Sequence, residues 1–521
     1  MDKEELFKPY IQDDLALLPP CIGDFISPSD PVRLVSTIVD KLDISNILKD
    51  YKGGGTTSYH PRMLLKIIIY AYLCNIYSGR KIEKMLCENI KFMWLSGMAR
   101  PDYRTINLFR SKRLANGIFE DLFSQVVELL NSEGLVSLQV QYIDGTKIES
   151  AANKYTFVWR GSVEKNKQKL LNKVHFILVQ ANDLLSQELQ EEIPDELSPE
   201  LMKEKTERII KKLESSDLDK DNLKKKIKEL KEIKEEKANK LESYNKHLEI
   251  LGQRNSYSKT DPDATFMRMK EDAMMNGQTK PGYNVQISTE NQFITHFGIY
   301  WRPTDTGTMI DYLESFKHTY EKQSPVVVAD SGYGSEQNYE YMFSNGITPY
   351  VKYNMFHAES KQNYKKRIFL SANFKYDKES DSFICPNNKR LSKFETGTII
   401  SELGFQSEVI RYKAEDCSQC PYRHECYKGK SNSRIIEVNQ KLKEYKNKAR
   451  QLLESEEGLM HRSRRPIEPE AVFGDIKYNH GFKRFRLRST AKVIIEFGLV
   501  ALAHNIRKWA NIRNEMNAVI S

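Results

Sequence analysis

The sequence predicts an α/β protein in which a central sheet follows an all-helical region and is interrupted by two insertions. Apolar residues recur three and four positions apart through residues 31–130, which is the spacing of helices. Two separate β-rich runs, 136–150 and 283–301, are followed by a helical pattern at 306–322 and an apolar strand at 325–329, so the core mixes strands with helices. The 521 residues provide for three to four domains at about 150 residues each.

The composition excludes two broad classes of protein. Hydrophobic residues make up 40% and charged residues 29%, which is too apolar for a disordered chain and too charged for one embedded mainly in a membrane. The first residues, MDKEELFKPYIQDD, do not have the pattern of a secretory signal. Seven cysteines, an odd number, do not suggest a disulfide framework, so we expect a cytoplasmic protein. The net charge of +9 suits an anionic partner.

We expect residues 1–130 to form a helical DNA-binding domain. In the segment WLSGMARPDYRTINLFRSKRL, a Gly/Pro turn precedes a helix that carries several cations. A basic helix entered through a short turn is typical of helix-turn-helix DNA recognition, although a solvated helix face has the same composition. The candidate DNA contacts on this helix are Arg104, Arg110, Lys112 and Arg113.

The rest of the chain divides into a core and its two insertions. We expect the core to begin at 136–160, to resume at 256–355 and to end with the helices of 456–521. Residues 161–255 are rich in Lys and Glu with apolar positions three and four apart, which predicts a helical hairpin or coiled coil with a structural role. Residues 356–455 hold four of the seven cysteines and form the second, cysteine-bearing insertion.

Three carboxylates are the candidate catalytic residues. Asp144 and Asp330 each end an apolar strand and are each followed by glycine within two residues, so loops at the rim of a sheet would expose them to a hard cation. A helix starting after Pro469 would place Glu470 and Lys477 on one face. Together the three carboxylates would hold two divalent cations for phosphodiester chemistry. Glu468 is a rival for the third position, and the pair Asp261 and Asp263 is a weaker alternative site.

Two further patterns suggest ligands. A CxxC motif with two more thiols suits a tetrahedral structural zinc site, while reduced, unliganded thiols are the simpler interpretation. A basic block interleaved with aromatic residues, near Glu470, is typical of a surface that holds phosphates and stacks on bases. The thiols are Cys385, Cys417, Cys420 and Cys426, with His424 as a substitute for one of them, and the basic block is Lys477, Lys483, Arg484, Arg486 and Arg488.

Several long stretches resemble insertion-sequence transposases of the DDE class, most closely the eleven-eighty-two group. They are DGTKIESAANKYTFVWRG, KTDPDATFMRMKEDAMMNGQTKPGYNVQ, VVADSGYGSEQNYEYM and EPEAVFGDIKYNHGFKRFRLR, while SYHPRMLLKIIIYAYL and PDYRTINLFRSKRL are similar to the start of InsH-like transposases. The resemblance implies an RNase H-like core with Asp144, Asp330 and Glu470 as its metal-binding triad. It also implies two Mg²⁺ or Mn²⁺ ions, terminal inverted repeats and target DNA as substrates, a homodimer in the synaptic complex, and a nucleoid-associated bacterial protein.

The resemblance departs from the family pattern at one motif. Related families carry a Tyr-x2-Arg-x3-Glu-x6-Lys signature, of which Glu470 and Lys477 match the second half. Pro466 stands at the Arg position and Ser463 at the Tyr position, which leaves Arg464 or Arg465 as the substitute for the Arg. Two other functions stay open, a metal-dependent nuclease that does not join strands and a domesticated DNA-binding protein.

Overall fold

The computed structural model describes residues 21–49, 51, 58–216, 220–269 and 277–520. At its centre lies a six-stranded sheet with the order β4-β5-β1-β7-β8, in which β6 also pairs with β5. β1 is antiparallel to β5 and parallel to β7, and β7 is parallel to β8. The mixed α/β class predicted from the sequence is therefore confirmed. The strands are β1 (Val140–Glu149), β4 (Thr265–Arg268), β5 (Thr279–Glu290), β6 (Phe293–Tyr300), β7 (Val326–Ala329) and β8 (Thr348–Val351).

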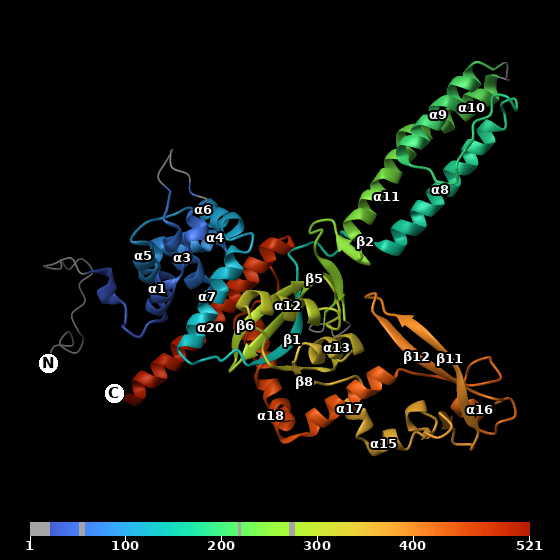
Figure 1. Cartoon of the computed structure of the whole chain (residues 1–521). Coiled ribbons are helices and arrows are strands. Elements are labelled where there is room, and N and C mark those ends of the chain that lie inside the picture. Colours follow the sequence, from blue (N-terminus) through green and yellow to red (C-terminus); the bar gives the residue numbers. More distant parts are fainter. Residues whose placement is uncertain (1–20, 50, 52–57, 217–219, 270–276, 521) are drawn as a thin grey trace, which may run out of the picture.

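Helices cover the sheet and connect its strands. α12 lies between β6 and β7 in the chain, α13 lies between β7 and β8, and α17 to α20 follow the second insertion (Figure 1). The apolar side chains of β7, β8, α13 and α17 share one buried cluster. These helices are α12 (Met309–Tyr320), α13 (Glu336–Ser344), α17 (Gln440–Glu454), α18 (Glu456–Arg464), α19 (Pro469–Gly474) and α20 (Thr490–Ile520).

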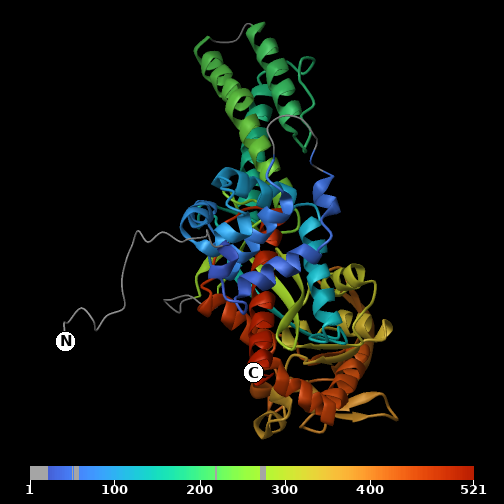
Figure 2. The same cartoon turned by 90° about the vertical axis from the view of Figure 1, so that its left-hand side faces the viewer.

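The first helices of the chain share a hydrophobic core with the sheet and with the last helix. Val35 of α1, Ile67 of α3, Val126 of α7, Phe293 of β6 and Leu499 of α20 belong to one buried cluster. Figures 1 and 2 show α20 running between these helices and the sheet. The helices are α1 (Pro31–Lys41), α2 (Ser45–Leu48), α3 (Pro61–Leu73), α4 (Gly79–Glu88), α5 (Ile90–Ser96), α6 (Tyr103–Leu108) and α7 (Ile118–Ser132).

The first insertion is a long helical bundle that projects from the core (Figure 1). The expectation of a two-helix hairpin was wrong, because α8, α9, α10 and α11 all contribute apolar side chains to one buried cluster. β2 and β3, on either side of the bundle in the chain, pair with each other and join its two ends. The elements are β2 (Phe157–Trp159), α8 (Arg160–Asn182), α9 (Pro199–Glu214), α10 (Lys220–Glu232), α11 (Ala238–Leu251) and β3 (Ser256–Ser258).

The second insertion contains a five-stranded antiparallel sheet of order β13-β12-β11-β10-β9. It extends from the core in a different direction from the bundle (Figures 1 and 2). No helix among the described residues combines the length and the apolar character that crossing a bilayer requires. The elements are α14 (Phe356–Glu359), α15 (Gln362–Lys365), β9 (Lys375–Asp377), β10 (Ser382–Ile384), β11 (Arg390–Ile400), β12 (Gln406–Ala414), α16 (Arg423–Cys426) and β13 (Ile435–Val438).

Candidate active site

The sheet and α19 bring Asp144, Asp330 and Glu470 to one place. Asp144 lies in the middle of β1 and not at its end as expected, because β5 continues to pair with β1 as far as Glu149. On its other side β1 pairs with β7 only up to Tyr142, so Asp144 lies beyond that pairing. Asp330 directly follows β7 and accepts a hydrogen bond of 2.8 Å from the Gly332 N–H. Neighbouring parallel strands therefore deliver both aspartates to the same edge.

The guanidinium of Arg465 connects all three carboxylates. Its Nη2 lies 3.1 Å from an oxygen of Asp144 and 3.7 Å from one of Asp330, and its Nη1 donates to Glu470. Arg465 lies one turn before Glu470, and only 9% of its side chain is exposed. A buried guanidinium needs compensating carboxylates, and this one has them.

Asp144 is the most enclosed of the three carboxylates, since 16% of its side chain is exposed against 39% for Asp330 and 47% for Glu470. Burial raises the pKa of Asp144 to about 6, and the negative charges of Asp330 and Glu470 act in the same direction against the opposing charge of Arg465. The cluster therefore carries more negative charge than one guanidinium neutralises, which is the electrostatic condition for binding further cations.

The donor set suits a divalent cation such as Mg²⁺, because every candidate ligand is a carboxylate oxygen. Among the described residues no group of three or more His, Cys, Asp or Glu side chains stands in an arrangement that would hold a metal ion. At this site the guanidinium of Arg465 lies among the carboxylates. The residue types thus fit the metal, and a cation would have to take the place of Arg465 beside them.

Asp305, which the sequence analysis missed, is a fourth carboxylate beside these residues. Its Oδ1 accepts hydrogen bonds of 2.8 Å from the side-chain amides of both Asn284 and Gln286. A Cβ on Gly145 would come within 2.6 Å of the same oxygen, so the glycine that follows Asp144 leaves the room that Asp305 occupies. Asp305 lies in a loop after β6 with no periodic pattern around it, and no sequence signal marked it.

The rival carboxylates have other partners. Glu468 is 5% exposed and accepts hydrogen bonds from the Thr289 hydroxyl (2.9 Å) and the Gln292 N–H (2.8 Å). Asp261 is fully buried and accepts from the hydroxyls of Ser150 and Tyr283. These contacts are structural, so the geometry favours Glu470 as the third carboxylate. It also favours Arg465 over Arg464, which is exposed.

The basic helix of the first domain is only partly available to a ligand. Arg110 is 4% exposed, and its guanidinium donates to the Tyr72 hydroxyl, the Tyr77 carbonyl and the Asn107 side chain. Its prediction as a DNA contact was therefore wrong, because these buried bonds hold it inside the domain. Arg104 and Lys112 are exposed and Arg113 is half-buried.

The basic block after α19 is divided in a similar way. Lys483, Arg484, Arg486 and Arg488 are exposed, whereas Phe482 and Phe485 are each 1% exposed and belong to the core. These two phenylalanines do not form the stacking surface that their spacing suggested. Lys477 is 5% exposed and donates a 2.6 Å hydrogen bond to Thr146, two residues after Asp144 on β1, so it faces the site from inside the protein.

The four candidate zinc ligands line one small cavity of about 20 Å³ in the second insertion. All four thiols are free of disulfides. Cys420 N–H donates to the Cys417 carbonyl at 3.2 Å, and Arg434 donates to Cys426 Sγ at 2.8 Å. The sulfurs are not gathered at metal-binding distance, since the described residues include no such group. The cavity has room for one water-sized particle.

Two family models match parts of this chain. One, described as a transposase DDE domain, matches residues 384–510 and includes Glu470. The other, described as a transposase domain (DUF772), matches residues 20–112 and includes α1 to α6. No curated protein and no solved structure matches the chain.

Proposed function

The two matched families indicate an insertion-sequence DDE transposase, and from this premise we propose that the protein binds the terminal inverted repeats of its element, cleaves the DNA and transfers the 3′-OH strand to target DNA. The observation that carries the proposal is the convergence of Asp144, Asp330 and Glu470 on Arg465. These residues lie far apart in the sequence, so a shared site is a product of the fold.

The sheet supports an RNase H-like core. Its order places an antiparallel β6-β5-β1 hairpin series beside two parallel strands, β7 and β8. In this arrangement the central strand β1 and its parallel neighbour β7 supply the two aspartates, and a helix that comes later in the chain supplies the glutamate.

Asp144, Asp330 and Glu470 are the residues that would hold two Mg²⁺ or Mn²⁺ ions. Bound divalent cations would supply activation of the attacking oxygen and stabilisation of the leaving oxygen. The protein orients the three carboxylates by a strand, a strand end and a helix turn, which are rigid elements. Lys477 and the exposed cations at 483, 484, 486 and 488 hold the DNA phosphates near the site.

Two further features belong to this proposal. The exposed Arg104 and Lys112 of the first domain contribute to end binding, and two copies of the chain assemble in the synaptic complex. In the second insertion, Cys385, Cys417, Cys420 and Cys426 bind one structural Zn²⁺. The insertion needs such support because its buried cluster has only six apolar residues in the described structure, and so small a core gains much from a metal.

A cleavage and strand-transfer assay tests the function. The substrate is a duplex that carries the repeat flanking the element, with Mg²⁺ and a second duplex as target. We expect Asp144→Asn and Asp330→Asn to abolish strand cleavage and to leave end binding intact, because the amides lose the negative charge that a cation requires. Glu456→Gln changes an exposed carboxylate on α18 and is the matched control.

Three outcomes separate the alternatives. Normal cleavage by either aspartate variant refutes the assignment of the site. Cleavage without transfer of a pre-cut 3′ end into the second duplex identifies a metal-dependent nuclease. End binding by the wild-type protein without any cleavage, over a range of Mg²⁺ and Mn²⁺ concentrations, identifies a domesticated DNA-binding protein.

A further inference from the structure

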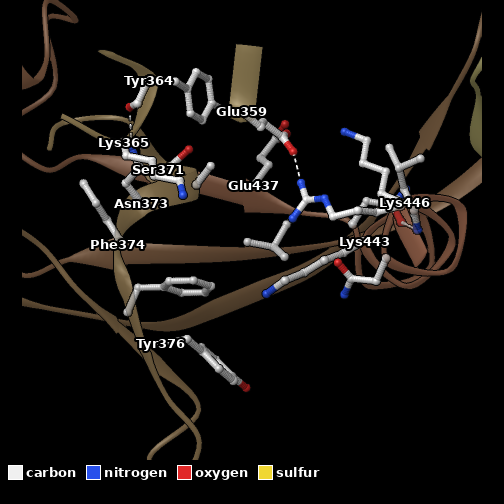
Figure 3. Close-up of a pocket in the computed structure, with 17 residues that line it drawn as sticks. Glu359, Tyr364, Lys365, Ser371, Asn373, Phe374, Tyr376, Glu437, Lys443 and Lys446 are labelled. Atoms are coloured by element: carbon white, nitrogen blue, oxygen red, sulfur yellow. Dashed lines mark hydrogen bonds and ion pairs between the residues drawn. The ribbon is translucent and has the colours of Figure 1, made fainter. Parts of the chain in front are cut away.

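A large pocket lies between the second insertion and α17, away from the three carboxylates. Its volume is about 590 Å³, within the range of about 300–1,000 Å³ that accommodates organic ligands. One wall is α17, which contributes Lys443, Lys446 and Arg450, and the opposite wall carries Tyr364, Phe374 and Tyr376 from the insertion (Figure 3).

The charges of the pocket favour an anionic ligand. Its two carboxylates already have cationic partners, since Glu359 pairs with Arg450 and Glu437 pairs with Arg411 at 2.8 Å. The three lysines that line it, 365, 443 and 446, form no ion pair with any described residue. Three ammonium groups are therefore left without a carboxylate around one cavity, which is an unfavourable arrangement that negative phosphates would relieve.

Aromatic rings lie beside these lysines. The ammonium of Lys443 lies 5.6 Å from the centre of the Tyr376 ring, and that of Lys446 lies 5.4 Å from the centre of the Tyr353 ring. Phosphate-binding cations interleaved with aromatic faces are the combination that binds unpaired nucleic-acid strands, because the bases of a duplex are already stacked on each other.

The pocket is also connected to the candidate active site through β8. Tyr353, which contacts Arg450 and Glu359 at the pocket, is the neighbour of Lys352. The pKa of Lys352 is lowered by burial and by the charges of Arg465 and Arg462, with Asp330 and Glu470 opposing. Lys352 thus lies within the electric field of the carboxylates, one residue from the pocket, and the two sites can contact one DNA substrate.

We propose that this pocket binds an unpaired segment of the DNA substrate, with its phosphates on the three lysines and a base against the aromatic wall. The inference rests on the proposed function and adds to it a single-strand subsite. A double-stranded segment does not fit this description, because its bases are not free to stack on protein side chains.

The test compares the binding of two labelled DNAs by fluorescence anisotropy over a range of salt concentrations. One is a blunt duplex that ends in the repeat, and the other has the same duplex with an unpaired tail. The pocket variant is Lys443→Ala/Lys446→Ala. The matched control, Lys441→Ala/Lys448→Ala, removes the same charge from α17 at residues that contact Glu340 and Phe343 instead and that do not line the pocket.

We expect the pocket variant to lose about tenfold in affinity for the tailed DNA, and its salt slope to fall by about 1.4, or 0.7 for each lost phosphate contact on a single strand. Its affinity for blunt DNA and both affinities of the control should stay near wild type. Equal losses in the two variants, or a loss on blunt DNA alone, would overturn the inference.

A second measurement does not depend on the stability of the variant. Bromodeoxyuridine in the tail of DNA bound to the wild-type protein should photo-crosslink to peptides of residues 364–376 or 440–450, and crosslinks confined to other peptides contradict the subsite. If the wild-type protein binds neither DNA, the proposed function fails together with the inference. If it binds and cleaves the blunt substrate while the tail makes no difference, only the inference fails.

Discussion

The Nη2 atom of Arg465 lies 3.1 Å from Oδ1 of Asp144, although 320 residues separate the two in the chain. The same guanidinium pairs with Glu470, which lies on the element that follows it. A single cation thereby holds a strand residue and a helix residue in register. In this arrangement Arg465 is the counter-ion of the carboxylates as long as no metal occupies their centre.

Replacing Arg465 by Gln should destabilise the protein and strengthen its response to divalent ions. We expect a loss of about 2–4 kcal/mol in the free energy of unfolding in EDTA, because Asp144 keeps its buried charge without a partner while the other two carboxylates are partly solvated. Mg²⁺ should then raise the melting temperature more in the variant than in the wild type, since it no longer competes with the guanidinium.

Thermal unfolding in EDTA and across a Mg²⁺ titration measures both effects. Arg464→Gln removes the same charge from an exposed neighbour and should behave like the wild type. A smaller Mg²⁺ response in Arg465→Gln than in the wild type would contradict the role of Arg465 as a counter-ion.

Gly145→Ala should be destabilising by about 1–3 kcal/mol, because the added methyl group meets Asp305 at 2.6 Å and well-packed sites resist overpacking. Gly161→Ala is the comparison, since no atom lies within 4 Å of its added Cβ and alanine favours the helix in which it lies by about 0.5–1 kcal/mol. Urea unfolding of both variants checks the difference. A stable Gly145→Ala protein would show that Asp305 is free to move.

Purified protein should contain one zinc ion per chain, measured by elemental mass spectrometry. Cys417→Ser/Cys420→Ser should lose the metal and lower the melting temperature, because structural zinc contributes directly to the folding of small domains. Cys74→Ser/Cys87→Ser removes two exposed thiols outside the insertion and should keep the zinc. A metal-free native protein with four reactive thiols in that insertion would disprove the zinc site.

Stability should fall as the pH drops below about 6.5, in part because of His296. This residue is 7% exposed on β6, its Nε2 lies 3.1 Å from the Ser315 hydroxyl, and burial lowers its pKa to about 3. Between pH 6.5 and 3 the unfolded chain binds a proton that the folded chain does not, so acid favours unfolding. The histidine should account for about 2 kcal/mol of the loss between pH 7 and 5.

His296→Gln should reduce that loss by the same amount, and chemical unfolding at the two pH values measures it. His318→Gln, which alters an exposed histidine on α12, should show the pH dependence of the wild type. An unchanged pH dependence in His296→Gln would mean that this ring is protonated in the folded protein.

Periodicity and strand composition were sufficient to predict the α/β class, the β5-β6 hairpin and the apolar strand that ends before Asp330. These features depend on local patterns, which a sequence displays directly. The positions of Asp144 and Glu470 depended on a resemblance together with residue types, and the structure places both beside Asp330.

The features that were missed depend on contacts between distant segments. Arg110 has the same sequence character as Arg104, but the partners that bury it come from α3 and the loop that follows it. Asp305 becomes part of the site only through side chains of β5. The bundle has four helices instead of two because chain reversals between charged segments leave little trace in composition. Pairings of this kind are fixed by tertiary packing, which no local pattern encodes.

The packing of α20 has a consequence for the protein during its synthesis. A nascent chain emerging from the ribosome exposes the apolar faces of α1, α3 and α7 that α20 covers in the finished fold, and it carries Asp144 long before Glu470 has been translated. The helices that meet DNA and the carboxylates that would cut it therefore mature at nearly the same moment, after the last helix has left the exit tunnel. Premature termination anywhere in α20 would leave a sticky, inactive fragment for the quality-control proteases.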